Sequence, residues 1–196
     1  YEIYQCDWSS DVCSSDLLDS LDVPGFKIGS GECNNLPLIR HIARFGRPII
    51  VSTGMNDIES IKRTVDVLET ENASFALLHC TSMYPTPFSN VRLGSVTQLR
   101  DLFPNTVIGI SDHSLSNLPS ISAVALGASI IERHFTSDMK WIGEDIEISV
   151  DPAGLRELIE GSQIVHQASG GSKTVLRDEQ PTIDFAYASV VAIRDI

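Results

Sequence analysis

The chain has 196 residues, of which 42% are hydrophobic, and a formal net charge of −12 at pH 7. This length and hydrophobic content suffice for one domain with a buried core. The acidic balance argues against nucleic acid or an anionic membrane as a partner. The sequence has no apolar run of about 18 residues and no basic segment before an apolar stretch, so it predicts neither a membrane span nor a signal peptide. Its four cysteines form no C-x-x-C pair, and a cytoplasmic location is predicted.

Residues 1–17 differ in composition from the rest of the chain. They contain four acidic and no basic residues, repeat the SSD triplet and show no helical or strand period. Within them, "DVCSSDL" resembles the in-frame translation of a common sequencing adapter, and a disordered acidic tail is the alternative interpretation. On either interpretation the segment is a non-native or disordered tail that contributes nothing to a functional site.

From residue 18 onward, short apolar runs alternate with helical patterns. The runs are rich in Ile, Val, Leu and Phe, as in strands buried on both faces of a parallel sheet. Residues suited to cap helices follow most of these runs: Asn35, Asn56 or Asp57, Asn117 and Asp151. The predicted strands are Phe26–Ser30, Pro48–Thr53, Phe75–Thr81, Thr106–Ser111 and Ser129–His134.

Five strand–helix units are compatible with an open doubly wound sheet or with part of a (β/α)8 barrel, which needs about 250 residues when complete. No glycine-rich nucleotide-binding fingerprint follows the first strand. Polar residues instead gather at the C-terminal end of every predicted strand, which is the face where a barrel assembles its active site. The predicted fold class is therefore α/β, as a partial (β/α)8 TIM barrel of about five units.

The ends of the last two predicted strands carry candidates for a metal site. His113 lies two residues after Ser111, and His134 lies two residues after Glu132, so each pair shares a strand face if the strand persists. Neighbouring parallel strands would bring the two imidazoles together, and two histidines with ligand oxygens suit a divalent transition metal. Each histidine taken alone is also compatible with a structural role. Arg133 alternates with Glu132 and His134 and is expected to point away from them.

Other polar residues leave more than one interpretation open. Lys27 could bind a phosphate or carboxylate, form a Schiff base, or extend outward from the sheet. It alternates against Ser30 and Glu32, so the three can share one face only if the intervening glycines bend the strand. The prolines of "HCTSMYPTP" stiffen a loop that either holds Tyr84 over a pocket or packs it for stability. His79, inside the preceding apolar strand, is interpreted as structural.

Six segments resemble, in order, motifs of the bacterial sialic acid synthase (N-acetylneuraminate synthase) family: "FKIGSGECNN", "PIIVSTGM", "LLHCTSMYPTP", "VIGISDHS", "ALGASIIERHFT" and "DFAYASVVA". Legionaminic and pseudaminic acid synthases are closely similar, and a spore coat polysaccharide synthesis protein belongs to the same group. The resemblance implies a (β/α)8 barrel joined to an antifreeze-like domain in a domain-swapped homodimer. It also implies condensation of phosphoenolpyruvate with an N-acetylated amino sugar (N-acetylmannosamine-like) and water, giving a nine-carbon 2-keto acid and phosphate.

The resemblance also implies roles for particular residues. The metal ligands would be His113 and His134, and the metal, Mn²⁺ before Mg²⁺ or Co²⁺, would polarise the sugar aldehyde. The contacts to phosphoenolpyruvate would come from Lys27, Ser30, Ser52 and Ser111. The contacts to the amino sugar would come from Glu32, Tyr84 and Asp145, with Glu32 or Asp145 as the catalytic proton-transfer group and Ser82 in place of an Asn of some members. On charge alone, Asp145 would instead be assigned to a solvated loop.

The resemblance covers only part of the family's pattern. Residues 18–180 would be about the last five units of the barrel, and residues 181–196 the start of the linker to the antifreeze-like domain. The family's first three or so strands have no counterpart, so we expect this chain to be an inactive fragment. The alternatives are a Schiff-base aldolase that uses Lys27, and a sugar- or anion-binding fragment without turnover.

Overall fold

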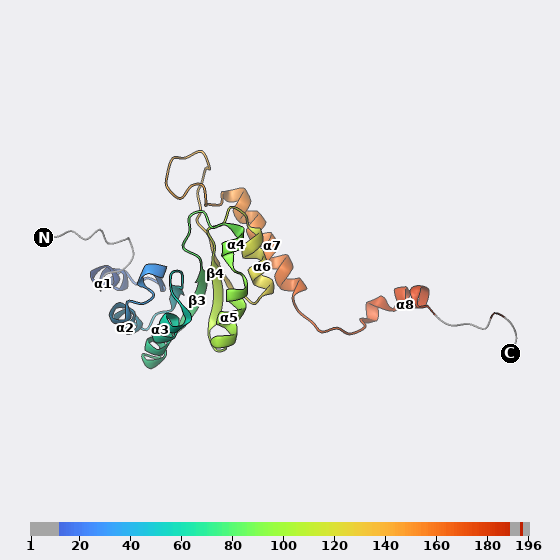
Figure 1. Ribbon diagram of the computed structural model, residues 1–196, viewed down its shortest axis with the longest axis horizontal. Helices are drawn as coiled ribbons and strands as arrows, with labels where there is room; N and C mark the ends of the chain where they lie inside the picture. Colours follow the sequence, from blue (N-terminus) through green and yellow to red (C-terminus); the bar gives the residue numbers. More distant parts are fainter. Residues whose placement is uncertain (1–11, 189–192, 194–196) are drawn as a thin grey trace.

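The computed structural model describes residues 12–188 and residue 193 (Figure 1). Five short strands form one parallel sheet in the order β1-β2-β3-β4-β5. Each strand therefore pairs with its neighbours in the sequence, as in the wall of a barrel, and the order does not reverse as in a doubly wound sheet. The partial (β/α)8 barrel is confirmed. The strands are β1 (Phe26–Ile28), β2 (Ile49–Ser52), β3 (Phe75–Cys80), β4 (Val107–Ser111) and β5 (Ile130–Glu132).

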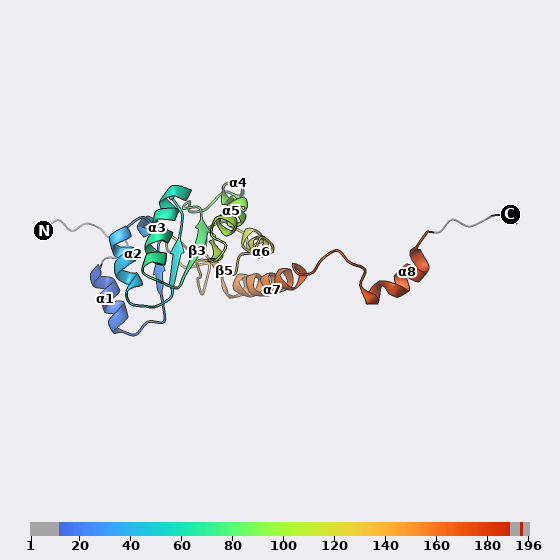
Figure 2. The ribbon, with the colours of Figure 1, turned by 90° about the horizontal axis from the view of Figure 1, so that it is seen from below.

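Helices connect the strands and lie along one side of the sheet, as Figure 2 shows from below. The opposite, inner side of the half-barrel has no helical cover among the described residues. Two 3-10 turns accompany the helices, at Ser30–Glu32 and Arg177–Glu179. The helices are α1 (Val12–Ser20), α2 (Leu36–Ala43), α3 (Ile58–Thr70), α4 (Phe88–Val91), α5 (Gly94–Leu102), α6 (Leu118–Ala125), α7 (Pro152–Ala168) and α8 (Gln180–Ala186).

The main core lies between the sheet and its helices. Ile39 and Ile42 of α2 and Leu68 of α3 are at most 1% exposed, and they pack in one cluster with strand residues such as Ile49 and Ile108. Burying an aliphatic side chain of this size stabilises the fold by about 1.5–3 kcal/mol. The cluster explains why the strands carry large apolar residues at every second position, since those side chains face the helices and are buried.

The inner side of the sheet is packed at close range where β4 meets its neighbours. Gly109 is in register with Leu78 of β3 and Ile130 of β5. A Cβ atom at Gly109 would lie 2.4 Å from the carbonyl oxygen of Ile130 and 2.5 Å from a methyl carbon of Leu78. A residue without a side chain is therefore required at this point of the sheet.

Helix starts agree with the capping signals in the sequence, with one exception. The carboxylates of Asp57 and Asp151 accept hydrogen bonds from the backbone of Ser60 and Gly154, and Asn35 caps α2 in the same manner. Asn117 is the exception. Its side-chain amide donates to the carbonyl of Gly154 at 2.9 Å and to Glu157, so it ties the start of α6 to α7 and caps no helix.

All five strands are shorter than predicted, and β1 and β5 end early at positions that concern the site. β1 ends at Ile28, and Ser30–Glu32 turn into a 3-10 helix. β5 ends at Glu132, so His134 lies beyond the regular strand. His134 is still held by the backbone, because its carbonyl accepts a hydrogen bond of 2.8 Å from the amide of Val150.

The start of the described chain is helical. The sequence predicts no regular structure for residues 1–17, and this is wrong for residues 12–17, which form most of α1. α1 lies beside α2, and Asp16 pairs with His41 at 2.7 Å across the two helices. Amphipathic periodicity is weak in this helix, which explains why the pattern was not visible. Residues 1–11 lie outside the described residues.

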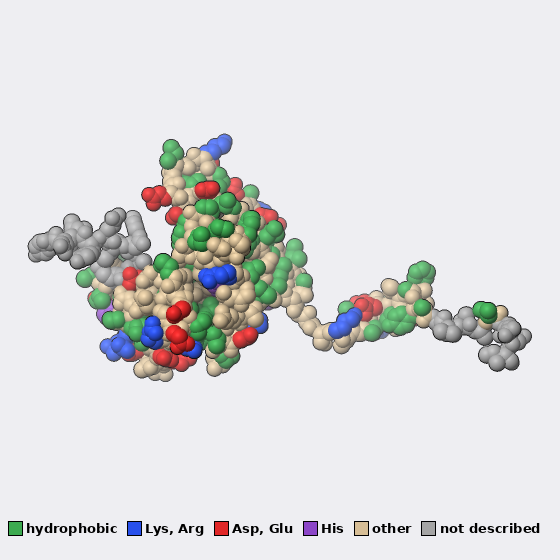
Figure 3. All heavy atoms as spheres, viewed as in Figure 1, with side chains coloured by type: hydrophobic (Ala, Val, Ile, Leu, Met, Phe, Trp, Pro, Cys, Tyr) green, Lys and Arg blue, Asp and Glu red, His purple; other side chains and the backbone are tan. Residues whose placement is uncertain are grey.

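The end of the described chain extends away from the half-barrel (Figure 1). α8 contains no buried residue, and Phe185 is 92% exposed. On the face seen in Figure 3, hydrophobic side chains gather near α7 and along this C-terminal segment. Within residues 12–188, no helix is both long and apolar enough to cross a membrane.

Candidate functional site

A cavity of about 420 Å³ opens at the C-terminal ends of the strands, on the inner side of the half-barrel. We call this cavity the mouth pocket. It contains nine of the ten site residues predicted from the sequence. These nine are Lys27, Ser30, Glu32, Ser52, Ser82, Tyr84, Ser111, His113 and His134.

Lys27 lies at the floor of the mouth pocket. Its ammonium group donates to the hydroxyl of Ser52 at 2.9 Å and to the carbonyl of Ile28 at 3.3 Å. It also pairs with Glu132 at 3.2 Å, across the width of the five strands. Both side chains of this pair are more than one third exposed, so their charges remain accessible from the pocket. Among the residues that the structure describes, Lys27 is the only Lys or Arg in the pocket lining.

Glu132 contacts polar side chains of two different strands in the mouth pocket. It contacts Lys27, and its carboxylate accepts a hydrogen bond of 3.0 Å from Ser111. The sequence places Glu132 on the same face as His134 by strand parity, but Glu132 was not among the predicted site residues. Strand alternation could have identified Glu132 as a site residue. Its register supports the same assignment, because Glu132 lies beside Ser111 in the sheet.

The 3-10 turn after β1 brings Ser30 and Glu32 to the same pocket as Lys27. Strand alternation predicts that Lys27 faces away from Ser30 and Glu32, but the strand ends before those two residues. The chain leaves the strand at Gly29, whose backbone is extended, so the bend comes from the 3-10 turn and not from a special glycine conformation. The hydroxyl of Ser30 accepts a hydrogen bond from the amide of Gly54 at 3.0 Å. The carboxylate of Glu32 accepts one from the side chain of Asn35 at 2.7 Å. Both groups are therefore oriented by their neighbours.

Gly54 provides the space between two of the serines. A Cβ atom there would lie 2.3 Å from the Ser82 hydroxyl oxygen, 2.7 Å from that of Ser30 and 3.1 Å from the sulfur of Cys80. A side chain at this position would displace the hydroxyls from the pocket. Gly54 was not predicted as a site residue, because nothing in a single sequence distinguishes it from any other loop glycine.

His113 and His134 face each other, with their ring centroids 5.2 Å apart. The ring of Tyr84 lies next to both, and its centroid is 4.2 Å from that of His113 and 6.0 Å from that of His134. Burial lowers the pKa of His113, and the neighbouring His134 lowers it further. Loss of hydration disfavours the charged imidazolium, so His113 is held neutral, which is the form that binds a metal.

The two histidines fit a metal site that needs ligands from elsewhere. Nδ1 of His113 lies 3.4 Å from the carbonyl of Thr81, and Nδ1 of His134 lies 3.4 Å from the carboxylate of Asp145. Partners at Nδ1 leave Nε2 for a metal, as is usual for ligating histidines. Among the described residues, no group of three His, Cys, Asp or Glu side chains could hold a metal ion. An ion here would therefore need oxygen atoms from substrate or water.

Asp145 is the predicted site residue that does not line the mouth pocket. Its side chain is 57% exposed, in the loop between β5 and α7, and its contact is with His134. It therefore lies at the rim, next to one of the candidate metal ligands.

Arg133 points away from the pocket, as strand parity predicts. Its guanidinium pairs with Asp112 at 2.9 Å, and the two side chains are only 4% and 1% exposed. It also donates to the carbonyls of Ser114 and Ser116 in the loop after β4. This buried pair fixes the loop that follows His113.

His79 is buried on the helix side of β3, in agreement with its interpretation as structural. Its Nε2 lies 2.7 Å from the carbonyl of Val91, and the residue is 5% exposed. Burial lowers its pKa, because a charged ring would lose its hydration there.

Residues 7–174 match the NeuB family. The matched range includes residues 7–17, which composition separates from the rest of the chain. The chain is 37% identical to N-acetylneuraminate-9-phosphate synthase of Homo sapiens, covering 93% of this chain and 51% of that protein. It is 40% identical to N,N'-diacetyllegionaminic acid synthase of Campylobacter jejuni, covering 95% of this chain and 57% of that protein.

Solved structures agree with this similarity. The N-acetylneuraminic acid synthetase of Leptospira borgpetersenii superposes with a TM-score of 0.84 at 32% identity, covering 89% of this chain and 61% of that one. The chain thus spans about half the length of the curated relatives it matches. The match over residues 7–174, together with the polar mouth of a parallel half-barrel, shows that the chain belongs to the NeuB family.

Proposed function

We propose that this chain carries the phosphoenolpyruvate- and metal-binding part of a sialic acid synthase-type site. The observation that carries the proposal is the convergence of nine predicted residues on one pocket in a chain of this family. The reaction joins C3 of phosphoenolpyruvate to the aldehyde carbon of an N-acetylated amino sugar. Water adds at C2, phosphate leaves with cleavage of its C–O bond, and a nine-carbon 2-keto acid results.

The floor of the pocket suits the anionic substrate. The ammonium of Lys27 supplies a positive charge, and the hydroxyls of Ser30 and Ser52 supply neutral donors around it. The hydroxyl of Ser111 donates to Glu132 and would turn to the ligand when that carboxylate is displaced. A phosphate or carboxylate that enters would replace part of the contact between Lys27 and Glu132. Charge-assisted hydrogen bonds of this kind are the strong ones in proteins.

The upper wall suits the amino sugar. Glu32 is half-buried and already accepts a hydrogen bond from Asn35, so its carboxylate is oriented for proton transfer with a sugar hydroxyl. Tyr84 lies over the histidines, Asp145 stands at the rim, and Ser82 takes the place of an Asn of some relatives. His113 and His134 would hold a divalent ion, Mn²⁺ before Mg²⁺ or Co²⁺, which supplies Lewis acidity toward the aldehyde oxygen.

A Schiff-base mechanism at Lys27 is less well supported. A lysine that attacks a carbonyl needs a free amine, and here the group donates to Ser52 and Ile28 and pairs with Glu132. Borohydride reduction with a keto substrate would trap an adduct on Lys27 if this alternative held, and EDTA would leave the reaction unchanged.

We also propose that the chain by itself binds phosphoenolpyruvate but turns over little, as a binding fragment would. Among the described residues, β1 and β5 each pair on one side only, so the mouth pocket lacks a wall. The choice of amino sugar, homodimer assembly and a cytoplasmic location belong to the same proposal.

Calorimetric titration with phosphoenolpyruvate in the presence of Mn²⁺ tests the binding part. We expect Lys27→Met to weaken binding at least about tenfold, which corresponds to about 1.4 kcal/mol. Lys62→Met, at an exposed lysine of α3, is the matched control and should bind normally. Equal affinity of both variants would contradict the assignment.

Phosphate release tests the reaction. Full-rate release that depends on both N-acetylmannosamine and Mn²⁺ would support the condensation and contradict the proposal that this chain only binds. Binding without release would support the fragment. Release of phosphate without the sugar would overturn the condensation.

A further inference from the structure

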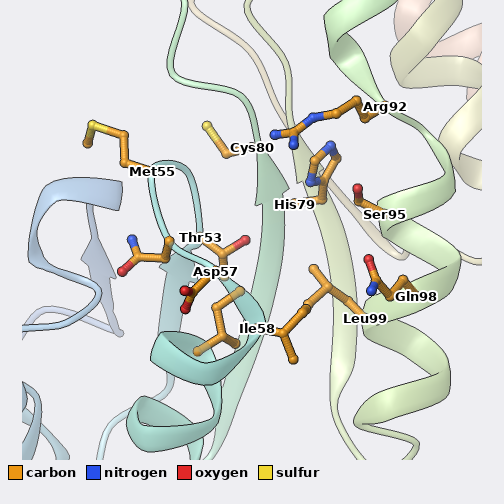
Figure 4. Close-up of a pocket in the computed structure, with 12 residues that line it drawn as sticks. Thr53, Met55, Asp57, Ile58, His79, Cys80, Arg92, Ser95, Gln98 and Leu99 are labelled. Carbon is orange, nitrogen blue, oxygen red and sulfur yellow. The ribbon is translucent and has the colours of Figure 1, made fainter.

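A second cavity, of about 400 Å³, lies on the helix side of β3. We call it the outer pocket. Its walls come from the loop before α3 and the start of that helix, from the end of β3, and from Arg92 and α5, as Figure 4 shows. It borders the mouth pocket at Met55 and Cys80 but opens on the opposite face of the strand. All its walls belong to two consecutive strand–helix units, so the described residues suffice to form it.

Arg92 supplies a positive charge to this pocket, without an acidic partner in the described part of the chain. Its side chain is exposed, and its guanidinium donates a long hydrogen bond of 3.4 Å to the hydroxyl of Thr81. Among the described residues it forms no ion pair with a carboxylate. Figure 4 shows the guanidinium reaching over the end of β3, above His79 and toward Cys80. A planar guanidinium in such a position is suited to a phosphate or carboxylate.

Arg92 also has a backbone conformation that few residues of its type adopt. Its φ is 52° and its ψ is 55°, in the left-handed region. This conformation turns the chain between α4 and α5 and directs the side chain toward the pocket. Left-handed backbone at a residue other than glycine is uncommon and costs about 1 kcal/mol or more.

His79 presents a hydrogen-bond acceptor to the same space. Because Nε2 lies 2.7 Å from the carbonyl of Val91, it carries the proton, and Nδ1 of the neutral ring is the acceptor. Nδ1 makes no hydrogen bond with a described residue. A group that binds to it must therefore donate, as a hydroxyl does and a phosphate dianion does not.

The remaining polar groups complete a site for a hydroxylated molecule. Ser95 and Gln98 of α5 line the wall near Arg92. Asp57 stands across the pocket (Figure 4). One of its oxygens caps α3 through Ser60, and the other makes no hydrogen bond with a described residue. An acceptor facing a lone cation across one cavity favours a ligand with an anionic end and a hydroxylated body.

We propose that the outer pocket binds a small polyhydroxylated anion, such as a sugar phosphate or a sugar acid. The anionic group would bind Arg92 and Ser95, and the hydroxyls would donate to His79 Nδ1 and Asp57. A volume of about 400 Å³ is within the usual size of small-molecule sites. The site is separate from the mouth pocket and does not depend on the function proposed above.

Titration calorimetry with glucose 6-phosphate, gluconate, glucose and inorganic phosphate tests this site. We expect glucose 6-phosphate, gluconate or both to bind, and glucose and inorganic phosphate to bind more weakly. Arg92→Gln should weaken binding at least about tenfold. Arg63→Gln, at an exposed arginine of α3 outside both pockets, is the matched control and should bind as the unaltered chain does. Ser95→Ala is a second, milder variant and should weaken binding about threefold or more.

Histidine ring NMR locates the ligand. We expect the ring signals of His79 to shift, and those of His113 and His134 to stay in place. Lys27→Met should leave the binding of glucose 6-phosphate unchanged, so failure of one site is distinguishable from failure of the other. Three results would each overturn the proposal. The first is a dissociation constant above about 10 mM for both anionic sugars. The others are an affinity of Arg92→Gln equal to that of the unaltered chain, and NMR shifts confined to histidines of the mouth pocket. Equal affinity for inorganic phosphate and for glucose 6-phosphate would show that the pocket does not recognise the hydroxyl groups, and would contradict that part of the proposal.

Discussion

Two ion pairs, each with one partner at the end of β5, differ in burial and in the side of the sheet on which they lie. Arg133 and Asp112 lie on the helix side, at 2.9 Å, with side chains 4% and 1% exposed. Lys27 and Glu132 lie on the inner side, at 3.2 Å, with side chains 38% and 37% exposed. Glu132 and Arg133 are consecutive, so strand alternation alone sends them to opposite faces.

The difference in burial separates a pair that stabilises the fold, Arg133 and Asp112, from a pair that is open to a ligand, Lys27 and Glu132. The buried pair is surrounded by further hydrogen bonds to carbonyls and to Ser120, so neither partner can leave. The inner pair is half open, and an anionic ligand can compete for Lys27. The histidines differ in side and not in burial, since both are buried, His79 toward the helices and His113 beside the mouth pocket. Three of the four predictions change a member of this comparison, and the other changes the packing of the sheet between the two sides.

Removing one partner of the buried pair should have the largest effect. We expect Asp112→Ala to lower the free energy of unfolding by about 3–5 kcal/mol, because Arg133 would remain charged and buried without its partner. Urea denaturation followed by circular dichroism measures this change. The double variant Asp112→Leu/Arg133→Met should lose less than the sum of its single variants. Additive losses would show that the two residues stabilise the fold separately.

Filling the close contact in the sheet should have the next largest effect. We expect Gly109→Ala to cost about 1–3 kcal/mol of unfolding free energy, because the new methyl group would meet the backbone of Ile130 and the side chain of Leu78. Gly94→Ala is the control, since nothing lies within 4 Å of a Cβ atom at Gly94. A cost at Gly94 as large as that at Gly109 would point to a helix-start effect and not to strand packing.

The buried histidine should make stability depend on pH. The pKa of His79 is lowered in the folded chain, so below the ordinary value near 6.5 the unfolded chain takes up the proton first. The stability is therefore complete above that value and falls as the pH drops toward the lowered pKa. We expect unfolding midpoints in urea to fall between pH 7 and pH 5.

The variant His79→Gln isolates this contribution. Glutamine can keep a donor to the carbonyl of Val91 and does not titrate, so the loss of stability on acidification should become smaller. His166→Gln, at an exposed position of α7, should leave the loss as it is. An unchanged pH dependence in His79→Gln would assign the effect to other groups, His113 first among them.

Removing the inner cation should have the smallest effect on stability. We expect Lys27→Met to change the free energy of unfolding by less than about 1 kcal/mol, as is usual for exposed pairs. The same change should weaken phosphoenolpyruvate binding about tenfold. A loss of stability as large as that of Asp112→Ala would mean that the inner pair is structural and would remove the contrast between the two faces.

Much of the fold was accessible from local patterns. The apolar runs identify all five strands, and the caps at Asn35, Asp57 and Asp151 lie where the sequence places them. These features depend on residues close together in the chain, so a single sequence contains the information. The convergence of polar strand ends on one pocket follows as well, because parallel strands end at one edge.

Other parts of the site depend on contacts between distant segments. Local periodicity does not predict three features of the site. These are the turn at Ser30–Glu32, the pairing of Asp112 with Arg133, and the space that Gly54 leaves for Ser82. For Asn117, a good capping residue was drawn to α7 by a tertiary hydrogen bond.

The sequence by itself determined which residues alternate between faces, where helices begin, and which polar groups end each strand. These follow from the two-residue period of a strand and from the unsatisfied backbone groups of a helix end. The tertiary structure decided which of those polar groups are buried partners and which remain open to a ligand. Burial depends on what packs against each face, and that is set by segments distant along the chain, such as α7, whose Glu157 accepts a hydrogen bond from Asn117.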